Sequence, residues 1–403
     1  MSLASGRPYV AIPGPSVMPD RVLAAMQRPA PNIYTGAIVD LTQSILADLK
    51  RVANCTAHVA LYICNGHGAW EAAIANMASR GDRILVCSTG HFGLGWADHA
   101  RRMGLQVDLL DFGRQAPIDP ARVREALAAD REHSIRAVLM TQVDTATSLL
   151  NDVPAVRDAI DAAGHPALLA VDAIASLACE PVYFDAWGID VLIAASQKGL
   201  MTPPGISFLW ISEKALAASK DSDLATPYWD WKTRVAPRVF SHNFGGTSPT
   251  HHLYALREAL DMIAEEGLEA IWARHRALAR AVWSAFDAWS QDGDIALNVS
   301  NPAYRSHAVT AARIGDGGAE RLRTWVEEKA GITLGIGLGM VEPGAPTQND
   351  FLRVAHMGHV NAHMTLGMLA TMEAGLQALH IPHGKGAVDA AAGAIADSLA
   401  DRI

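Results

Sequence analysis

The middle of the chain alternates short apolar runs with amphipathic stretches. The apolar runs are typical of buried strands and cover residues 59–64, 83–87, 105–110, 135–141, 167–172 and 191–195. Between them, apolar residues at helical spacing predict helices over 70–78, 92–103, 120–129 and 153–163. Nearly continuous apolar strands separated by helices indicate an α/β fold with a mostly parallel sheet covered by helices. Such a sheet binds its ligand at the carboxyl ends of its strands.

The pattern changes after about residue 250. Residues 253–289 form a long helical pattern with an interruption near Gly267, and a smaller α/β domain is predicted from a strand over 308–314 and helices over 319–330 and 361–379. Asn361 is the candidate N-cap of the last helix. A length of 403 residues is enough for two or three domains. We therefore expect an N-terminal arm (1–14), a large domain (15–255) and a small C-terminal domain (256–403).

Composition and charge narrow the classes of function. Half of the residues are hydrophobic and 19% are charged, which argues against disorder. The net charge of -9 argues against nucleic acid or an anionic membrane as a partner. The four cysteines form no regular framework, and neither a signal peptide nor an apolar run of about 18 residues is apparent. We expect a cytoplasmic protein with reduced thiols.

Charged residues end two neighbouring predicted strands. Asp172 ends the run 167–172, and Lys198 closes the Ser-Gln-Lys sequence that follows the run 191–195. A buried lysine loses water and its pKa falls, as Schiff-base chemistry requires, while a carboxylate beside it can hold a protonated ring nitrogen. This is the pair of partners that a pyridoxal 5'-phosphate (PLP) ring needs. From these two residues alone, an ordinary ion pair that caps the sheet is an equal alternative.

Two glycine-containing turns add to this pattern. Residues 65–71, Asn-Gly-His-Gly-Ala-Trp-Glu, lie where a strand leads into a helix, and backbone N–H groups at a helix start favour an anion such as a phosphate. Phe92 follows the next strand in the sequence Gly-His-Phe-Gly, where its ring can lie over a pyridine face. A core phenylalanine is the alternative.

With these residues in place, the chain resembles the class V, fold-type I PLP-dependent aminotransferases, in the group of alanine–glyoxylate and serine–glyoxylate aminotransferases. The resemblance extends over nearly the whole chain. The matching segments are 12–16, 19–23, 65–73, 171–177, 196–198, 203–205, 228–231, 256–260, 267–269, 352–353, 356–358 and 382–384.

The resemblance implies the PLP fold type I for the large domain, a homodimer with active sites at the subunit interface, and a role for individual residues. Lys198 would form the Schiff base and shuttle the proton, and Asp172 would bind the pyridine nitrogen. Arg353 would bind the substrate α-carboxylate, with Tyr34 nearby. The other implied cofactor-binding residues, with Thr247 reaching in from the partner subunit, are Gly66, His67, Gly68, Phe92, Thr145, Gln197 and Thr247.

The implied reaction is a ping-pong transfer of an amino group from serine or a similar small amino acid to glyoxylate or another small 2-oxo acid. Departures from the family pattern lie around the substrate, so alanine–glyoxylate, aspartate–glyoxylate and pyridoxamine–pyruvate reactions remain alternatives. The departures are the segment 32–36, which contains Tyr34, the pair Val143-Asp144, and Ser148, Phe244 and Ala355.

Two other classes are weaker alternatives. A cysteine desulfurase needs a nucleophilic cysteine in the smaller domain, and no cysteine follows Cys179. A non-catalytic PLP-binding protein would not need the carboxylate-binding Arg353.

Two further groups of residues have open roles. We expect no metal site, although His356, His359 and His363 have a spacing that metal sites use. Trp229 and Trp231 either wall a substrate entrance or pack a seam between the domains.

Overall fold

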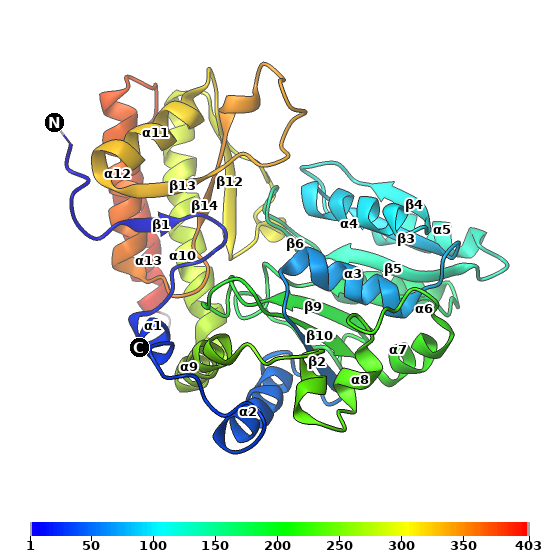
Figure 1. Ribbon diagram of the computed structural model, residues 1–403. Coiled ribbons are helices and arrows are strands. Elements are labelled where there is room, and N and C mark those ends of the chain that lie inside the picture. The colour runs from blue at the N-terminus through cyan, green and yellow to red at the C-terminus, as the bar shows by residue number, and fades with distance from the viewer. Residues whose placement is uncertain (1, 401–403) are drawn as a thin grey trace.

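The computed structural model describes residues 2–400 and contains two main sheets, each covered by helices (Figure 1). The outer limits of the expected arm and small domain, residue 1 and residues 401–403, lie outside this range. The larger sheet has the strand order β2-β10-β9-β8-β5-β3-β4. Its strands are β2 (His58–Tyr62), β3 (Arg83–Ser88), β4 (Gln106–Asp111), β5 (Ile135–Thr141), β8 (Leu168–Asp172), β9 (Val191–Ala195) and β10 (Ser207–Ile211).

This sheet is parallel except for β10, which runs antiparallel to both β2 and β9. The predicted fold class is confirmed, and the six strands predicted from apolar runs are all present. The prediction omitted β10. The segment that links it to β9 contains the turn Pro203-Pro204-Gly205 and is too short for a crossover helix, so the chain returns antiparallel.

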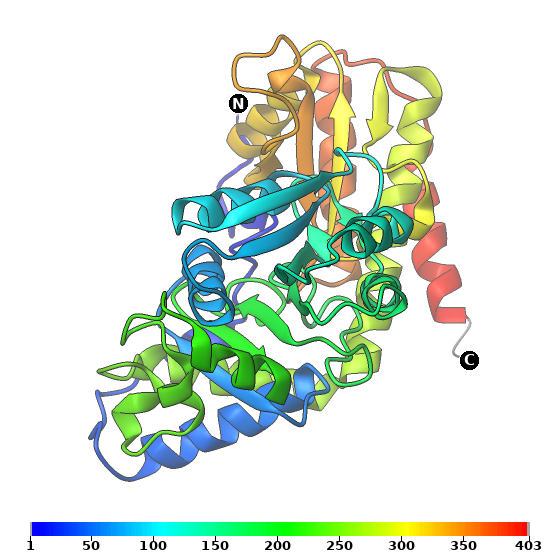
Figure 2. The ribbon, with the colours of Figure 1, turned by 90° about the vertical axis from the view of Figure 1, so that its right-hand side faces the viewer.

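Helices cover both faces of the larger sheet because its strands are apolar on both sides. Along β8, Leu169 and Val171 belong to the core on one face, and Leu168 and Ala170 belong to the core on the other. Figure 2 shows the layer with α3 and α4 on one side and the layer with α5 and α6 on the other. The first face is covered by α2 (Ala37–Val52), α5 (Pro120–Ala129), α6 (Val153–Ala162) and α9 (Thr250–Glu266), and the second by α3 (Gly66–Met77), α4 (His91–Arg102), α7 (Glu213–Ala218) and α8 (Trp231–Val235).

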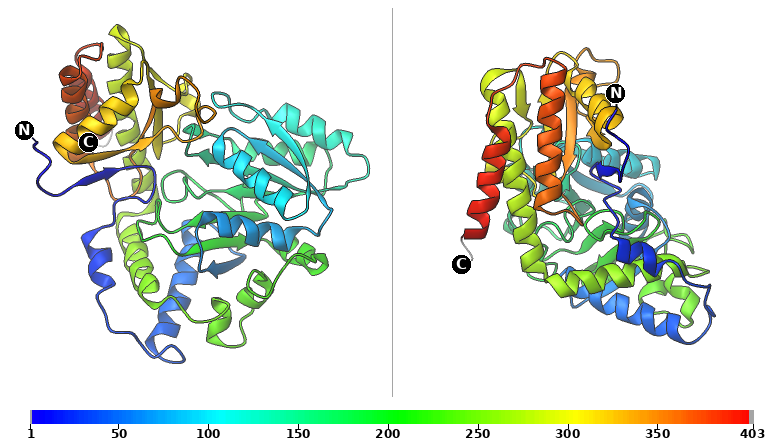
Figure 3. Two further views of the ribbon diagram at one scale, coloured as in Figure 1. Left: turned by 45° about the horizontal axis from the view of Figure 1, so that its top comes forward. Right: turned by 90° about the vertical axis from the view of Figure 1, so that its left-hand side faces the viewer.

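The smaller sheet has the order β1-β13-β14-β12-β11 and its own apolar core. Helices α10, α12 and α13 lie side by side (Figure 3, right), and apolar residues of all three belong to this core. Its edge strand β1 comes from the expected N-terminal arm and pairs in parallel with β13. The elements are β1 (Tyr9–Ala11), β11 (Ile295–Leu297), β12 (Val309–Ile314), β13 (Ile332–Ile336), β14 (Phe351–Ala355), α10 (Leu268–Trp289), α11 (Gly318–Ala330), α12 (Ala362–Ala378) and α13 (Ala387–Ala400).

The long helical pattern after residue 250 is two helices that meet at Gly267, whose φ of 82° suits glycine. Helix α9 packs on α2 and on α1 (Asp20–Ala25), and α10 packs on the smaller sheet. Asn361 is confirmed as the N-cap of α12, because its side chain accepts a hydrogen bond from the backbone N of Met364 at 3.0 Å. Within residues 2–400, no helix combines the length and apolar character needed to cross a membrane.

Helix α3 begins at Gly66, four residues before the start predicted from periodicity. Asn65 caps it through its side-chain oxygen, which accepts from the backbone N of His67 and Gly68. The glycine turn is therefore the first turn of the helix. The prediction missed this start because glycines interrupt the apolar spacing.

Arg234 on α8 is a buried cation that ties three backbone segments together. Its guanidinium donates to the carbonyl oxygens of Leu61, Asn243 and Tyr228 and lies 4.1 Å from the centroid of the Tyr62 ring. Burial lowers its pKa. These bonds fix the course of the segment 228–243, which leads to the loop that carries Thr247.

We predict that Arg234→Ala lowers the free energy of unfolding by about 3 kcal/mol, because three backbone carbonyl groups, two of them in buried hydrogen bonds, lose the guanidinium donor. Denaturant unfolding followed by tryptophan fluorescence measures the change. Lys232→Ala is the control on the same helix, since the Lys232 amine makes a single hydrogen bond, to Ser219 O, and we expect a loss of about 1 kcal/mol or less. Equal losses for the two variants would contradict the prediction.

Candidate active site

A cavity of about 180 Å³ lies at the carboxyl edge of the larger sheet, next to the first turns of α3 and α4. We call it the strand-end cavity. Seven of the nine residues that the sequence pointed to as cofactor-binding line it; Gly68 and Thr247 do not. The lining residues are Asn65, Gly66, His67, Trp70, Phe92, Val143, Thr145, Asp172, Ile174, Ala175, Gln197 and Lys198.

Asp172 is the last residue of β8 and is almost fully buried. Its Oδ1 accepts from the backbone N of Ile174 at 2.7 Å, and its Oδ2 accepts from the indole Nε1 of Trp70 at 2.8 Å. Burial raises the pKa of Asp172 to about 7, while these two hydrogen bonds lower it. The carboxyl group is therefore poised between its two protonation states near neutral pH.

Lys198 lies in the turn after β9 and is buried. Burial, together with the positive charge of Arg353, lowers its pKa to about 8, against an opposing effect of Asp172. A substantial fraction of this amine is neutral near physiological pH, as a nucleophile or a proton acceptor must be.

The N-terminal segment holds the Lys198 turn from outside the sheet. The Lys198 amine donates to Pro13 O, Ser16 Oγ donates to Lys198 O at 2.7 Å, and Ser16 N donates to Gln197 O at 2.9 Å. Gly14 has a φ of 106°, and a Cβ at that position would overlap the Lys198 side chain. Segment 12–16 was noted in the sequence as part of the family resemblance, but no role could be assigned to it there.

Arg353 lies on β14 of the smaller sheet and is 7% exposed. Its Nε donates to Ile336 O at 2.7 Å and its Nη1 donates to Thr145 O at 3.0 Å, so it links the smaller sheet to the segment that follows β5. A guanidinium has five N–H donors, and these bonds use two. Burial lowers its pKa to about 10, which leaves it charged at neutral pH. Arg353 does not line the strand-end cavity, although its charge acts on Lys198.

The glycine turn supplies a helix start, but part of it is already capped. The backbone N–H groups of His67 and Gly68 donate to Asn65 Oδ1. Gly68 lies outside the cavity wall, where a Cβ would meet Cys64 and Trp229. A phosphate bound here would accept from these N–H groups either together with Asn65 Oδ1 or in its place. Asn65 could have been found from the preference for asparagine at N-caps.

Asp144 is a buried carboxylate that sequence reasoning recorded only as a departure from the family pattern. Its Oδ2 accepts from the backbone N of Phe92 at 2.9 Å and of Gly93 at 3.3 Å, so it caps α4 from a different segment. Burial raises its pKa, and the backbone donors oppose that rise. Asp144 thereby fixes the helix turn that carries Phe92 into the cavity.

Ser148, where the family pattern has a glycine, closes the same turn. Its backbone N donates to Asp144 O at 2.8 Å, and its φ of 62° lies in the left-handed region that favours glycine. Serine therefore replaces the glycine of the family pattern at position 148, while the backbone keeps a left-handed conformation that glycine adopts readily.

Two expected site residues lie away from the cavity. Tyr34 is 79% exposed, and Thr247 is exposed in the loop before α9.

Trp231 lies neither at a substrate entrance nor at a seam between the domains, the two positions expected for it. It is fully buried in the core of the larger sheet, on the face covered by α3. Trp229 packs against Tyr62 at the same side, with ring centroids 5.8 Å apart. The apolar character of both residues was visible in the sequence, but not which neighbours would bury them.

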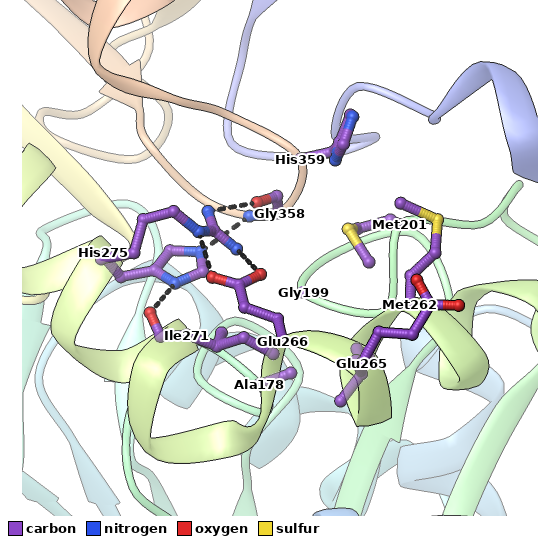
Figure 4. A pocket seen from close by; sticks show the side chains of 12 residues that line it. Ala178, Gly199, Met201, Met262, Glu265, Glu266, Ile271, His275, Gly358 and His359 are labelled. Carbon is purple, nitrogen blue, oxygen red and sulfur yellow. Dashed lines mark hydrogen bonds and ion pairs between the residues drawn. The ribbon is translucent and has the colours of Figure 1, made fainter.

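A second cavity, of about 250 Å³, lies behind the Lys198 turn and is shown in Figure 4. Arg274 on α10 pairs with Glu266 and donates to the carbonyl oxygens of Gly358 and Val360. His275 donates through Nδ1 to Ile271 O and accepts from Gly358 N at 3.0 Å through Nε2. Burial lowers the His275 pKa to about 3, so the ring is neutral. These bonds fix the loop that follows the Arg353 strand.

The three histidines of the 356–363 segment do not converge. His356 is buried and donates to His307 O at 2.7 Å, and burial lowers its pKa to about 3. His359 lies at the second cavity (Figure 4), and His363 bonds Asn361 Oδ1 at 3.1 Å. Among the residues that the structure describes, no group of three or more His, Cys, Asp or Glu side chains is placed to hold a metal ion.

Comparisons with known proteins identify relatives of this chain and proteins of the same fold. The family described as aminotransferase class-V matches residues 11–357. A serine–glyoxylate aminotransferase of Methylorubrum extorquens is 35% identical over 92% of this chain and 91% of its own length. An L-aspartate–glyoxylate aminotransferase of Paracoccus denitrificans is 34% identical over 95% of this chain and 94% of its own. The crystal structure of pyridoxamine–pyruvate aminotransferase from Mesorhizobium loti has the same fold, with a TM-score of 0.88 at 24% identity over 98% of this chain and all of that one.

We predict that, in protein freed of any bound cofactor, acetylation of Lys198 by a small acylating reagent has its midpoint near pH 8, because the neutral amine is the reactive form and burial lowers its pKa to about 8. Mass spectrometry of the peptide that carries Lys198 measures the rate at each pH. Asp172→Asn should move the midpoint to lower pH, since the Asp172 charge raises the Lys198 pKa. Arg353→Met should move it to higher pH for the opposite reason. Shifts in the same direction would contradict the assignment.

Proposed function

The chain belongs to the class V aminotransferases, and from that premise we propose that it binds PLP in the strand-end cavity and transfers an amino group from serine or a similar small amino acid to glyoxylate or another small 2-oxo acid. One observation carries the proposal. Asp172 and Lys198 are buried and line the same cavity at the ends of adjacent parallel strands, with pKa values moved toward neutrality from opposite sides.

The residues present fit PLP. Asp172 can accept a hydrogen bond from a protonated pyridine nitrogen, since each of its oxygens keeps a lone pair beyond the bonds it already accepts. Gln197 has a buried side-chain Oε1 that lacks a hydrogen-bond partner among residues 2–400, and its amide lines the same cavity. The start of α3 supplies a favourable dipole for a phosphate.

Bound PLP supplies an electron sink, because its protonated pyridine ring withdraws electrons from the amino-acid Cα–H bond. The protein residues do the rest. With PLP bound, Lys198 would hold the cofactor and its freed amine would move the proton, Asp172 would keep the ring nitrogen protonated, and Phe92 would supply an aromatic wall of the cavity. The reaction is ping-pong, so the oxo acid made from the donor leaves before the acceptor binds.

Arg353 is proposed to bind the substrate α-carboxylate with the guanidinium donors that its backbone contacts leave free. Serine is the preferred donor in this proposal because serine–glyoxylate enzymes are among the relatives most similar to this chain. Aspartate and alanine are the alternatives, since relatives that use each of them also match.

We also propose a homodimer whose subunits complete each other's sites. Thr247 lies exposed on a loop outside the cavity, and Tyr34 is exposed beside α2. Both positions suit contact with a second subunit. Arg234 and its three carbonyl partners give the segment before Thr247 the fixed course that such a contact requires.

We predict that the purified protein gains a visible absorption band on addition of PLP, and that serine bleaches this band faster than alanine or aspartate. A stopped-flow screen of amino acids against the PLP-loaded protein measures the rates. Lys198→Ala should abolish bleaching and still allow noncovalent binding of PLP. A chain that takes up no PLP would contradict the proposed function, and faster bleaching by another amino acid would replace serine as the donor.

We predict that Arg353→Leu raises the KM for serine about 10- to 100-fold, because a charge-assisted hydrogen-bonded pair contributes about 1.5–3 kcal/mol. Ethanolamine, which is serine without its carboxylate, should react no more slowly with the variant than with the parent. Arg313→Leu, on the adjacent strand β12 with Asp294 as its partner, is the control and should leave both substrates unaffected. An unchanged KM for serine in Arg353→Leu would show that another residue binds the carboxylate.

A further inference from the structure

Trp70 is a wall residue of the strand-end cavity to which the family resemblance assigned no role. Its indole Nε1 donates to Asp172 Oδ2 at 2.8 Å, and the indole is 1% exposed. Two neutral donors therefore reach the carboxylate, one on each oxygen: this indole and the backbone N of Ile174.

The indole ring is held rigidly in this position. Trp96 on α4 stacks on it, with ring centroids 5.9 Å apart and an interplanar angle of 15°. His67 and Phe92 contact it edge to face, at centroid distances of 4.8 and 6.3 Å. A donor fixed by packing on several sides loses little freedom when it forms its hydrogen bond, so the bond holds one carboxylate orientation.

The charges around Asp172 make this donor important. Among the charged groups that act on it, Asp144 raises its pKa and Lys198 lowers it. Burial, the largest effect, favours the protonated carboxyl group. A protonated Asp172 could not stabilise a positive charge on a pyridine ring. The N–H donors of Trp70 and Ile174 favour the ionised form.

We propose that Trp70 is a positioning residue for the reaction: its indole N–H orients the Asp172 carboxylate and keeps it ionised, so that Asp172 can hold the protonated ring nitrogen of PLP. This inference rests on the proposed binding of PLP in the strand-end cavity. It concerns one contact, between Asp172 and the ring nitrogen, and leaves the phosphate and the aldehyde ends of the cofactor untouched.

The experiment compares two buried tryptophans and two cofactors. Trp70→Phe removes the donor to Asp172. Trp96→Phe removes the same atoms from the stacked neighbour, whose Nε1 is buried and has no hydrogen-bond partner in the described part of the chain. The full-length chains, freed of cofactor, are titrated with PLP and with 1-deaza-PLP, in which carbon replaces the ring nitrogen.

We expect Trp70→Phe to raise the Kd for PLP about tenfold, the effect of about one pKa unit on Asp172. The Kd for 1-deaza-PLP should change much less, because this analogue has no ring nitrogen for Asp172 to hold. Trp96→Phe should affect the two cofactors equally. For bound PLP, the pH at which the ring-nitrogen proton titrates, measured by absorption, should fall in Trp70→Phe and not in Trp96→Phe.

Equal losses for PLP and 1-deaza-PLP in Trp70→Phe, or matching behaviour of the two variants, would overturn the inference and leave the proposed function standing. Failure of the parent chain to bind PLP would overturn both. If Trp70→Phe does not fold, benzothienylalanine at position 70 keeps the shape of the indole and replaces its N–H by sulfur. The same selective loss of PLP binding is then expected.

Discussion

The burial of two opposite ionisable groups at the ends of adjacent parallel strands is the constraint on which the rest of the site depends. Asp172 ends β8 and Lys198 follows β9, two strands that are apolar on both faces, so both side chains are buried by the same packing that stabilises the sheet. Desolvation opposes the charged form of each group. Each therefore needs fixed polar partners, and most features of the site supply them.

These partners come from distant parts of the chain. The Lys198 turn is held by Pro13 and Ser16, and Asp172 by Trp70 and Ile174. A third group of contacts fixes the loop behind the lysine, where Arg274 and His275 bind the backbone of Gly358. Arg353 lies on the smaller sheet, and its side chain donates to Thr145 O in the segment that follows β5. This bond links the smaller sheet to a residue that lines the strand-end cavity.

Sequence patterns predicted the larger sheet well and the site in part, for physical reasons. Six of its strands were recognised because strands apolar on both faces give uninterrupted runs, and the parallel order brings their ends together. Asp172 and Lys198 could be predicted because charge at the end of such a run is costly without a partner. The prediction omitted β10, although its five residues are buried on both faces like those of β9.

Side-chain contacts between distant segments could not be predicted in the same way. The indole of Trp70 is indistinguishable from a core residue until its distance to Asp172 is known, and Asp144 could be identified as a cap for α4 only from the fold. Tyr34 and Thr247 lie outside the cavity of one chain, and the family resemblance placed Thr247 in a partner's site. The N-terminal strand β1 has a further consequence for biosynthesis. Tyr9 pairs with Ile332, so β1 can pair only after β13 has been synthesised, more than 300 residues later in the chain. Pro13 and Ser16 follow β1 and contact Lys198. Until β13 has been synthesised, the segment that carries them lacks the support of the β1–β13 pairing. A nascent chain can therefore contain every strand of the larger sheet before β1 can pair, so the N-terminal segment is placed by its strand partner only late in synthesis.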